Sequence, residues 1–111
     1  MQDVAIVGAG ELGANLAHVL ASSDVVGSIR LIDGAGSVAV GKALDIMQAS
    51  PIVSFATKVS AATDISYAAG STVVAIADRV GHGEWQGDEA VLMLKQLFQV
   101  AQSAIVLCAG A

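Results

Sequence analysis

The chain has 111 residues, of which 55% are hydrophobic and 14% are charged, and its net charge is −5. This length suits one folded domain, and the absence of any cluster of Lys and Arg argues against nucleic acid as a partner. No apolar run approaches the roughly 20 residues that cross a bilayer, and no signal-peptide pattern is present. We therefore expect a soluble, cytoplasmic protein with no membrane partner.

The first half of the chain predicts two strand–helix pairs. An apolar strand at Val4–Val7 leads through a glycine turn into a helix over Glu11–Ser22. A second strand at Ile29–Asp33 is followed by a helix over Val38–Ala49, which Pro51 ends because proline disfavours helix at the preceding residue.

The second half of the chain continues this alternation. Strands are predicted at Thr57–Ser60, Thr72–Ala77 and Ala104–Cys108, separated by a short helix from an Asp64 cap to Gly70 and a long helix over Asp88–Gln102. Strands that are continuous apolar runs and alternate with helices indicate a parallel sheet covered on both faces. The expected fold is a single α/β domain with five strands.

A glycine motif of the form GxGxxG lies between the first strand and the first helix, as GAGELG over residues 8–13. Gly8 permits a tight turn, Gly10 lets a pyrophosphate approach the backbone, and Gly13 lets the helix pack closely on the strand. The free N–H groups of Glu11 and Leu12 would then face the phosphates from the positive end of the helix. We predict a dinucleotide site here; the alternative is a turn with a structural role only.

A carboxylate follows the motif at the spacing that a dinucleotide site requires. Asp33 lies at the end of the second predicted strand, about 20 residues beyond Gly13. There it would accept hydrogen bonds from both ribose hydroxyls of NAD and repel the 2′-phosphate of NADP. The alternative is an ordinary aspartate before glycine in a turn. We predict NAD as the cofactor.

Other conspicuous residues have structural interpretations. Cys108, the single cysteine, excludes an internal disulfide, and its apolar neighbours predict a buried, inert thiol. Trp85 is expected to cover apolar surface rather than a cofactor. The segment Val91–Ala101 is apolar around more than one helical face, so we expect part of it to contact protein outside this sheet. No metal site is predicted, because no metal-ligand spacing occurs.

Three segments together resemble one family. They are GAGELGANLAHVL (residues 8–20), GKALDIMQASP (41–51) and TDISYAAGSTVVAI (63–76), and they are similar to the NAD-binding domain of lactate/malate dehydrogenases, malate dehydrogenases above all. The resemblance implies a Rossmann-type doubly wound sheet with strand order 3-2-1-4-5. It also implies subunit pairing through the helix that contains Ala43–Met47, where Lys42 and Asp45 would otherwise be solvated charges.

Beyond residue 76 the chain departs from this family. The family's threonine-alanine-glycine turn, which lies against the cofactor, corresponds here to Ala77, Asp78 and Arg79. The loop VGHGEWQG (80–87) has His82 and Asp88 near the places of two substrate-binding arginines, and neither side chain replaces a guanidinium fork. The family's asparagine-proline pair corresponds to residues 109–110, and its catalytic histidine and aspartate belong to a second half that this sequence does not reach.

We therefore predict an NAD-binding domain of a malate/lactate dehydrogenase-like oxidoreductase that has no catalytic residues and does not act alone. Ala77 joins the glycine motif and Asp33 among the predicted cofactor contacts. Binding should be modest, since Glu11, Asp33 and Asp78 all lie near an anionic cofactor. A homodimer or larger oligomer, or a separate substrate domain, is expected to cover apolar surface. The alternative is a non-catalytic nucleotide-sensing or assembly module, or the same fold without any cofactor.

Overall fold

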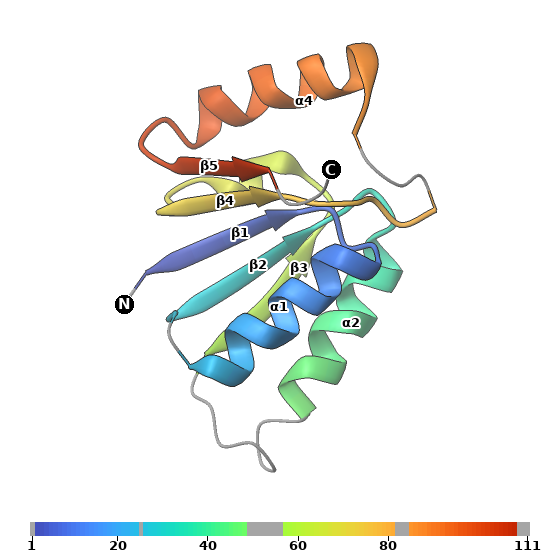
Figure 1. Cartoon of the computed structure of the whole chain (residues 1–111), viewed down its shortest axis with the longest axis vertical. Coiled ribbons are helices and arrows are strands. Elements are labelled where there is room, and N and C mark those ends of the chain that lie inside the picture. Colours follow the sequence, from blue (N-terminus) through green and yellow to red (C-terminus); the bar gives the residue numbers. More distant parts are fainter. Residues whose placement is uncertain (1, 25, 49–56, 82–84, 109–111) are drawn as a thin grey trace.

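Five strands alternate with helices along the chain (Figure 1), and the computed structural model describes residues 2–24, 26–48, 57–81 and 85–108. The elements are β1 (Asp3–Val7), α1 (Glu11–Ser23), β2 (Ser28–Ile32), α2 (Gly36–Gln48), β3 (Lys58–Ala62), the 3-10 helix η1 (Ile65–Ala68), β4 (Val73–Ile76), α4 (Gly87–Val100) and β5 (Ile105–Cys108). Within these ranges no helix is long and apolar enough to cross a membrane.

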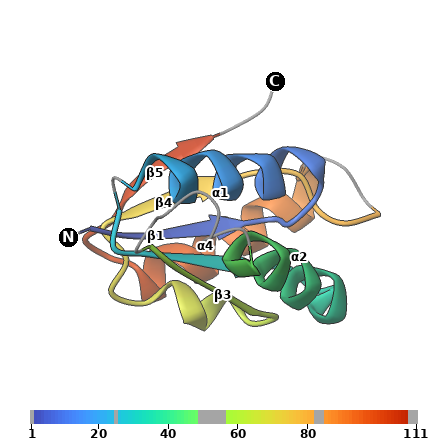
Figure 2. The same ribbon diagram turned by 90° about the horizontal axis from the view of Figure 1, so that it is seen from below.

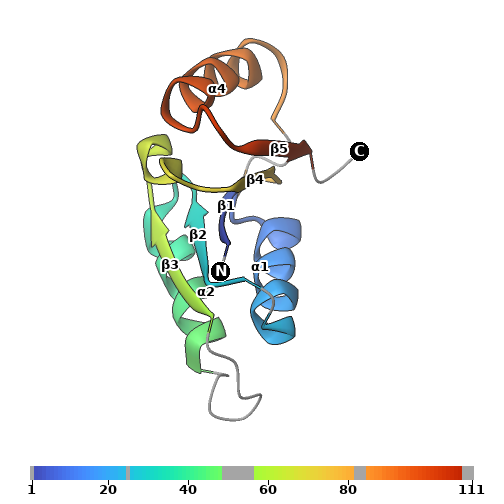
Figure 3. The same cartoon turned by 90° about the vertical axis from the view of Figure 1, so that its left-hand side faces the viewer.

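The strands form one parallel sheet in the order β3-β2-β1-β4-β5, which confirms the predicted fold and strand order. Val4 of the central strand pairs with Ile29 on one side and Val73 on the other. The sheet twists strongly between β3 and β5 (Figure 3). The chain reverses its winding between β1 and β4, and ligands of such sheets bind at the carboxyl ends of the strands beside this point.

Helices cover both faces of the sheet, with α1 and α2 on one face and α4 and η1 on the other (Figure 2). Successive strand residues contribute to opposite faces, as a two-residue period requires: Ile6 packs under α1, whereas Val7 packs under α4. Because both faces are covered, β1 is apolar from Val4 to Val7, and these four of its five residues are buried.

Helix α1 lies close to the sheet because the residues on its inner face are small. Gly13, Ala17 and Ala21 recur every four residues and are all buried. Helix α2 buries Ala39 and Ala43 in the same way. These small side chains bring the helix backbones near the strands, and this closeness fixes where the N-terminus of α1 meets the end of β1.

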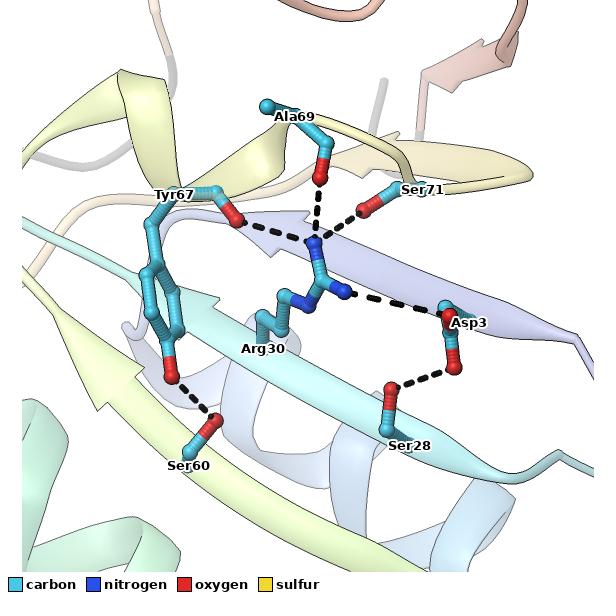
Figure 4. A network of polar contacts seen from close by, with 7 residues as sticks. All are labelled: Asp3, Ser28, Arg30, Ser60, Tyr67, Ala69 and Ser71. Atoms are coloured by element: carbon cyan, nitrogen blue, oxygen red, sulfur yellow. Dashed lines mark hydrogen bonds and ion pairs between the residues drawn. The ribbon is translucent and has the colours of Figure 1, made fainter.

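A half-buried arginine anchors the connection between β3 and β4, which contains only the short η1 (Figure 4). Nη1 of Arg30 on β2 donates to the carbonyl oxygens of Tyr67 (3.2 Å) and Ala69 (2.6 Å) and to the hydroxyl of Ser71 (3.4 Å). Its Nη2 lies 3.8 Å from the Asp3 carboxylate. A longer helix in this connection would pair these carbonyl groups through its own backbone. In its absence, the guanidinium supplies their hydrogen-bond donor.

Several element boundaries differ from the prediction by one or two residues. Helix α2 begins at Gly36 rather than Val38, because the carbonyl of Ala35 already accepts from the amides of Val38 and Ala39. Strand β3 covers Lys58–Ala62 rather than Thr57–Ser60. The predicted helix end at Ala49 and the stop at Pro51 lie outside the described residues.

Cys108 is exposed, so the prediction of a buried thiol was wrong. It lies on β5, which in the described part of the chain pairs with β4 alone and forms one edge of the sheet. The apolar run around it suggested burial on both faces, but Ile105 and Leu107 on the same strand are 62% and 55% exposed. Apolar sequence therefore marks β5 as a strand without making it a core strand.

Candidate cofactor-binding site at the carboxyl ends of β1, β2 and β4

The loops that follow β1, β2 and β4 meet at the carboxyl edge of the sheet. The amide of Gly8 donates to the carbonyl of Ile32 (2.7 Å), and the amide of Gly10 donates to the backbone carbonyl of Asp78 (2.9 Å). The backbone therefore binds the glycine motif to both neighbouring strands. Residues far apart in the sequence are held here in one fixed arrangement.

The glycines of the motif are required by close backbone contacts. Gly8 has φ +117°, and a Cβ there would lie 2.5 Å from the carbonyl oxygen of Asp78 and 2.6 Å from that of Ala77. A Cβ at Gly13 would overlap the carbonyl oxygen of Gly8. Ala77, a predicted cofactor contact, is only 3% exposed and lies directly beneath this turn.

Asp33 is buried and joins all three loops through its carboxylate. Its Oδ2 accepts from the amides of Ala9 (2.8 Å) and Val80 (2.9 Å), and its Oδ1 accepts from the amide of Ala35 (2.9 Å). A carboxylate has about four lone-pair positions, so three bonds leave one acceptor position, on Oδ1. The predicted contact with both ribose hydroxyls needs two acceptor positions, and this arrangement leaves one.

The positive end of α1 holds a carboxylate from β4's loop. Oδ2 of Asp78 accepts from the amide of Leu12 (3.2 Å), and Oδ1 accepts from the amide of Gly13 (2.9 Å). The prediction that the N–H of Leu12 is free to face phosphates is therefore wrong for this structure. Glu11, in the same first turn, has an exposed side chain. No local pattern in the sequence indicates the Asp78 contact, because it joins positions more than 60 residues apart.

Lys42 is partly buried and hydrogen-bonded, and is not the solvated charge that the sequence suggests. Its Nζ donates to the carbonyl oxygen of Ala9, at 2.7 Å, from the adjacent helix α2. This bond reaches the middle of the glycine motif and brings a positive charge beside it. Asp45, one turn further along α2, is exposed as expected.

A cavity of about 470 Å³ opens on the α4 side of the same edge. Its walls include Ile32, Gly34, Arg79, Trp85 and Met93. The Arg79 guanidinium lies 4.2 Å from the centre of the Trp85 ring, and it also forms an ion pair of 2.9 Å with Glu89 on α4. Trp85 packs on the edge of the apolar core, and it also lines this cavity.

Some predicted features cannot be placed. His82 and residues 109–110, where the chain departs from the dehydrogenase pattern, lie outside the described residues. Asp88 is exposed in the first turn of α4. Among residues 2–24, 26–48, 57–81 and 85–108, no group of three or more His, Cys, Asp or Glu side chains is placed to hold a metal ion.

The strand order, the glycine turn after β1 and the carboxylate at the end of β2 define a Rossmann-like dinucleotide-binding domain. Residues 2–103 match the family described as the lactate/malate dehydrogenase NAD binding domain. The chain belongs to this family.

Individual relatives are malate and lactate dehydrogenases. The chain is 47% identical over 74 residues to the malate dehydrogenase of Cytophaga hutchinsonii, covering 66% of this chain and 24% of that protein. It is 32% identical over 117 residues to the malate dehydrogenase of Pelagibacter ubique, covering 97% of this chain and 37% of that protein. A Cryptosporidium parvum lactate dehydrogenase in complex with lactic acid and nicotinamide adenine dinucleotide superimposes with a TM-score of 0.77 at 25% identity, covering 96% of this chain and 36% of that one. The chain thus spans roughly a third of the length of such relatives.

Proposed function

We propose that this chain binds NAD at the carboxyl edge of the sheet and serves as the cofactor-binding domain of a malate/lactate dehydrogenase-like oxidoreductase. The observation that carries the proposal is the meeting of the GAGELG turn with the Asp33 carboxylate through the Ala9 amide. A carboxylate beside a glycine turn that a phosphate can approach closely is the arrangement with which such sheets bind a dinucleotide. The family match supports the choice of cofactor.

Each part of NAD has a counterpart among the residues present. The remaining acceptor position of Asp33 would take one ribose hydroxyl, and the same carboxylate would repel a 2′-phosphate. The first turn of α1, with the amides of Glu11, Leu12 and Gly13 at the positive end of the helix, would hold the pyrophosphate once it displaces the Asp78 carboxylate. Gly10 would let the pyrophosphate approach the backbone closely. The adjacent cavity has the size of a small-molecule pocket. With Trp85 and Met93 in its walls, it would suit a flat heteroaromatic ring.

The purified chain is expected to bind NADH with a Kd no weaker than about 1 mM and to bind NADPH at least about tenfold more weakly, because Asp33 repels the additional phosphate. The measurement is a titration followed by NADH fluorescence and by quenching of Trp85. Equal affinity for the two cofactors would show that Asp33 does not contact the ribose. Failure to bind NADH at millimolar concentration would overturn the proposal while leaving the fold intact.

We further propose that the chain does not oxidise malate or lactate unaided. Oxo-acid binding needs a guanidinium free to take a carboxylate, and both arginines of this chain already contact partners, Arg30 in the β3–β4 connection and Arg79 on Glu89 and Trp85. A nucleotide-sensing or assembly module remains the alternative, and it would share the cofactor site but have no role in hydride transfer.

We also propose that the chain associates with a second copy of itself. Large apolar side chains are exposed on three elements, namely Val40 and Leu44 on α2, Val91, Leu92 and Phe98 on α4, and Ile105 and Leu107 on β5. Exposed apolar patches and unpaired strand edges mark association surfaces, and a symmetric dimer is the commonest way to cover them.

Light scattering at micromolar concentration is therefore expected to show a dimer or larger species. If the two copies pair through the edge strand β5, Ile105→Lys should yield a monomer. If they pair through helix α2, Leu44→Lys should yield a monomer. If the unmodified chain is a monomer, self-association is refuted, and a separate substrate domain becomes the better candidate to cover these surfaces.

A further inference from the structure

The side chain of Asp78 lies where a bound anion is expected. Both oxygens of its carboxylate accept from consecutive amides in the first turn of α1, those of Leu12 and Gly13. The carboxylate also packs against Gly10, where a Cβ would overlap its Oδ2 and lie 2.5 Å from its Cγ. The close-approach glycine of the motif is thus already covered by a group from the chain itself.

This arrangement and a bound pyrophosphate are mutually exclusive. Each backbone amide has one hydrogen, and the N–H groups of Leu12 and Gly13 are directed at Asp78. A phosphate placed against Gly10 would occupy the same volume as the carboxylate and would also be repelled by its negative charge. Two of the amides that would attract phosphate to this helix N-terminus already bind an internal anion.

The carboxylate is nevertheless able to leave. The backbone of Asp78 is fixed independently of its side chain, since its carbonyl accepts from the Gly10 amide at 2.9 Å. The bond to Leu12 is exposed and, at 3.2 Å, long. Rotation of the side chain toward solvent would free both amides without moving β4 or α1.

We propose that Asp78 is an internal competitor of the cofactor, whose carboxylate must leave the N-terminus of α1 before a pyrophosphate can bind there. This inference rests on the proposed NAD site. The apparent affinity for NAD is the intrinsic affinity of the site multiplied by the fraction of molecules in which the carboxylate has left α1. Residue 78 therefore sets how tightly the domain holds phosphate-bearing ligands, with little effect on ligands without phosphate.

The test compares two ligands with matched variants. NADH contains the pyrophosphate, and adenosine lacks any phosphate; their binding is followed by fluorescence and by NMR shift changes, respectively. Asp78→Ala is expected to bind NADH at least about tenfold more tightly. This gain follows if the carboxylate of the unmodified chain is away from α1 in about 10% of molecules. Binding of adenosine should be unchanged. Asp78→Asn, nearly isosteric and uncharged, should gain less. It covers the case in which the alanine variant folds poorly.

Asp88→Asn is the control, because it removes the same charge from the first turn of another helix, where the side chain is exposed. Its NADH affinity should match that of the unmodified chain. If that chain binds NADH and neither Asp78 variant binds it more tightly, Asp78 is merely a helix cap and the competition is refuted, whereas the NAD site stands. An equal gain for adenosine also refutes it. If neither the chain nor its variants bind NADH, the proposed function fails together with the inference.

Discussion

Gly13→Ala is expected to destabilise the domain by about 3 kcal/mol or more, a large fraction of the stability of a typical domain. A Cβ at this position overlaps the carbonyl oxygen of Gly8 and lies 2.9 Å from its carbonyl carbon. Both are backbone atoms of the turn between β1 and α1, so no side-chain rotation relieves the overlap. The helix would have to move away from the sheet, exposing the row of small residues with which it packs.

The matched control is Gly41→Ala, a glycine-to-alanine change within helix α2. No atom lies within 4 Å of the added Cβ, so only the backbone propensity changes, and stability should rise by about 1 kcal/mol. Urea unfolding followed by circular dichroism measures both variants. Opposite signs are expected; a loss at both positions, or a stable Gly13→Ala protein, would show that α1 does not pack on β1 at the distance described.

Asp33→Ala is expected to cost about 3 kcal/mol or more. Three amides lose their acceptor, that of Ala9 in a buried bond and those of Ala35 and Val80 in part-buried bonds, and an orphaned donor costs about 1–3 kcal/mol when it is buried. The loops after β1, β2 and β4 would separate. The free energy of unfolding in urea gives the magnitude, and NMR shift changes at Ala9, Ala35 and Val80 give the location. Weak NAD binding by this variant would then reflect a disordered site as well as a lost ribose contact.

Asp64→Ala provides the comparison for this effect. Asp64 caps η1 by accepting a single exposed bond from the Ser66 amide (3.0 Å), and its loss should cost about 1 kcal/mol. Equal losses for the two aspartates would mean that the three bonds to Asp33 contribute no more than one solvent-exposed bond. In that case the carboxylate would be free for a ligand.

Local patterns in the sequence determined the elements of this protein. Apolar runs at β1 and β4, and the apolar residues on both sides of Arg30 in β2, predict strands of a sheet covered on both faces. The spacing of Gly8, Gly10 and Gly13 predicts a tight turn opening a helix. These inferences hold because they depend on residues within one turn or one strand of each other. The family resemblance added the strand order and the cofactor.

Tertiary structure alone decided which groups occupy the predicted site. Asp33 satisfies three loop amides, Lys42 reaches the Ala9 carbonyl, and Asp78 binds the first turn of α1. Apart from the local bond between Asp33 and the Ala35 amide, these contacts join residues 24 to 66 positions apart. No local pattern encodes such a pairing, because it exists only after the strands have aligned their carboxyl ends. The exposure of Cys108 has a related cause: an edge strand and a central strand have the same apolar sequence, and only the sheet order distinguishes them.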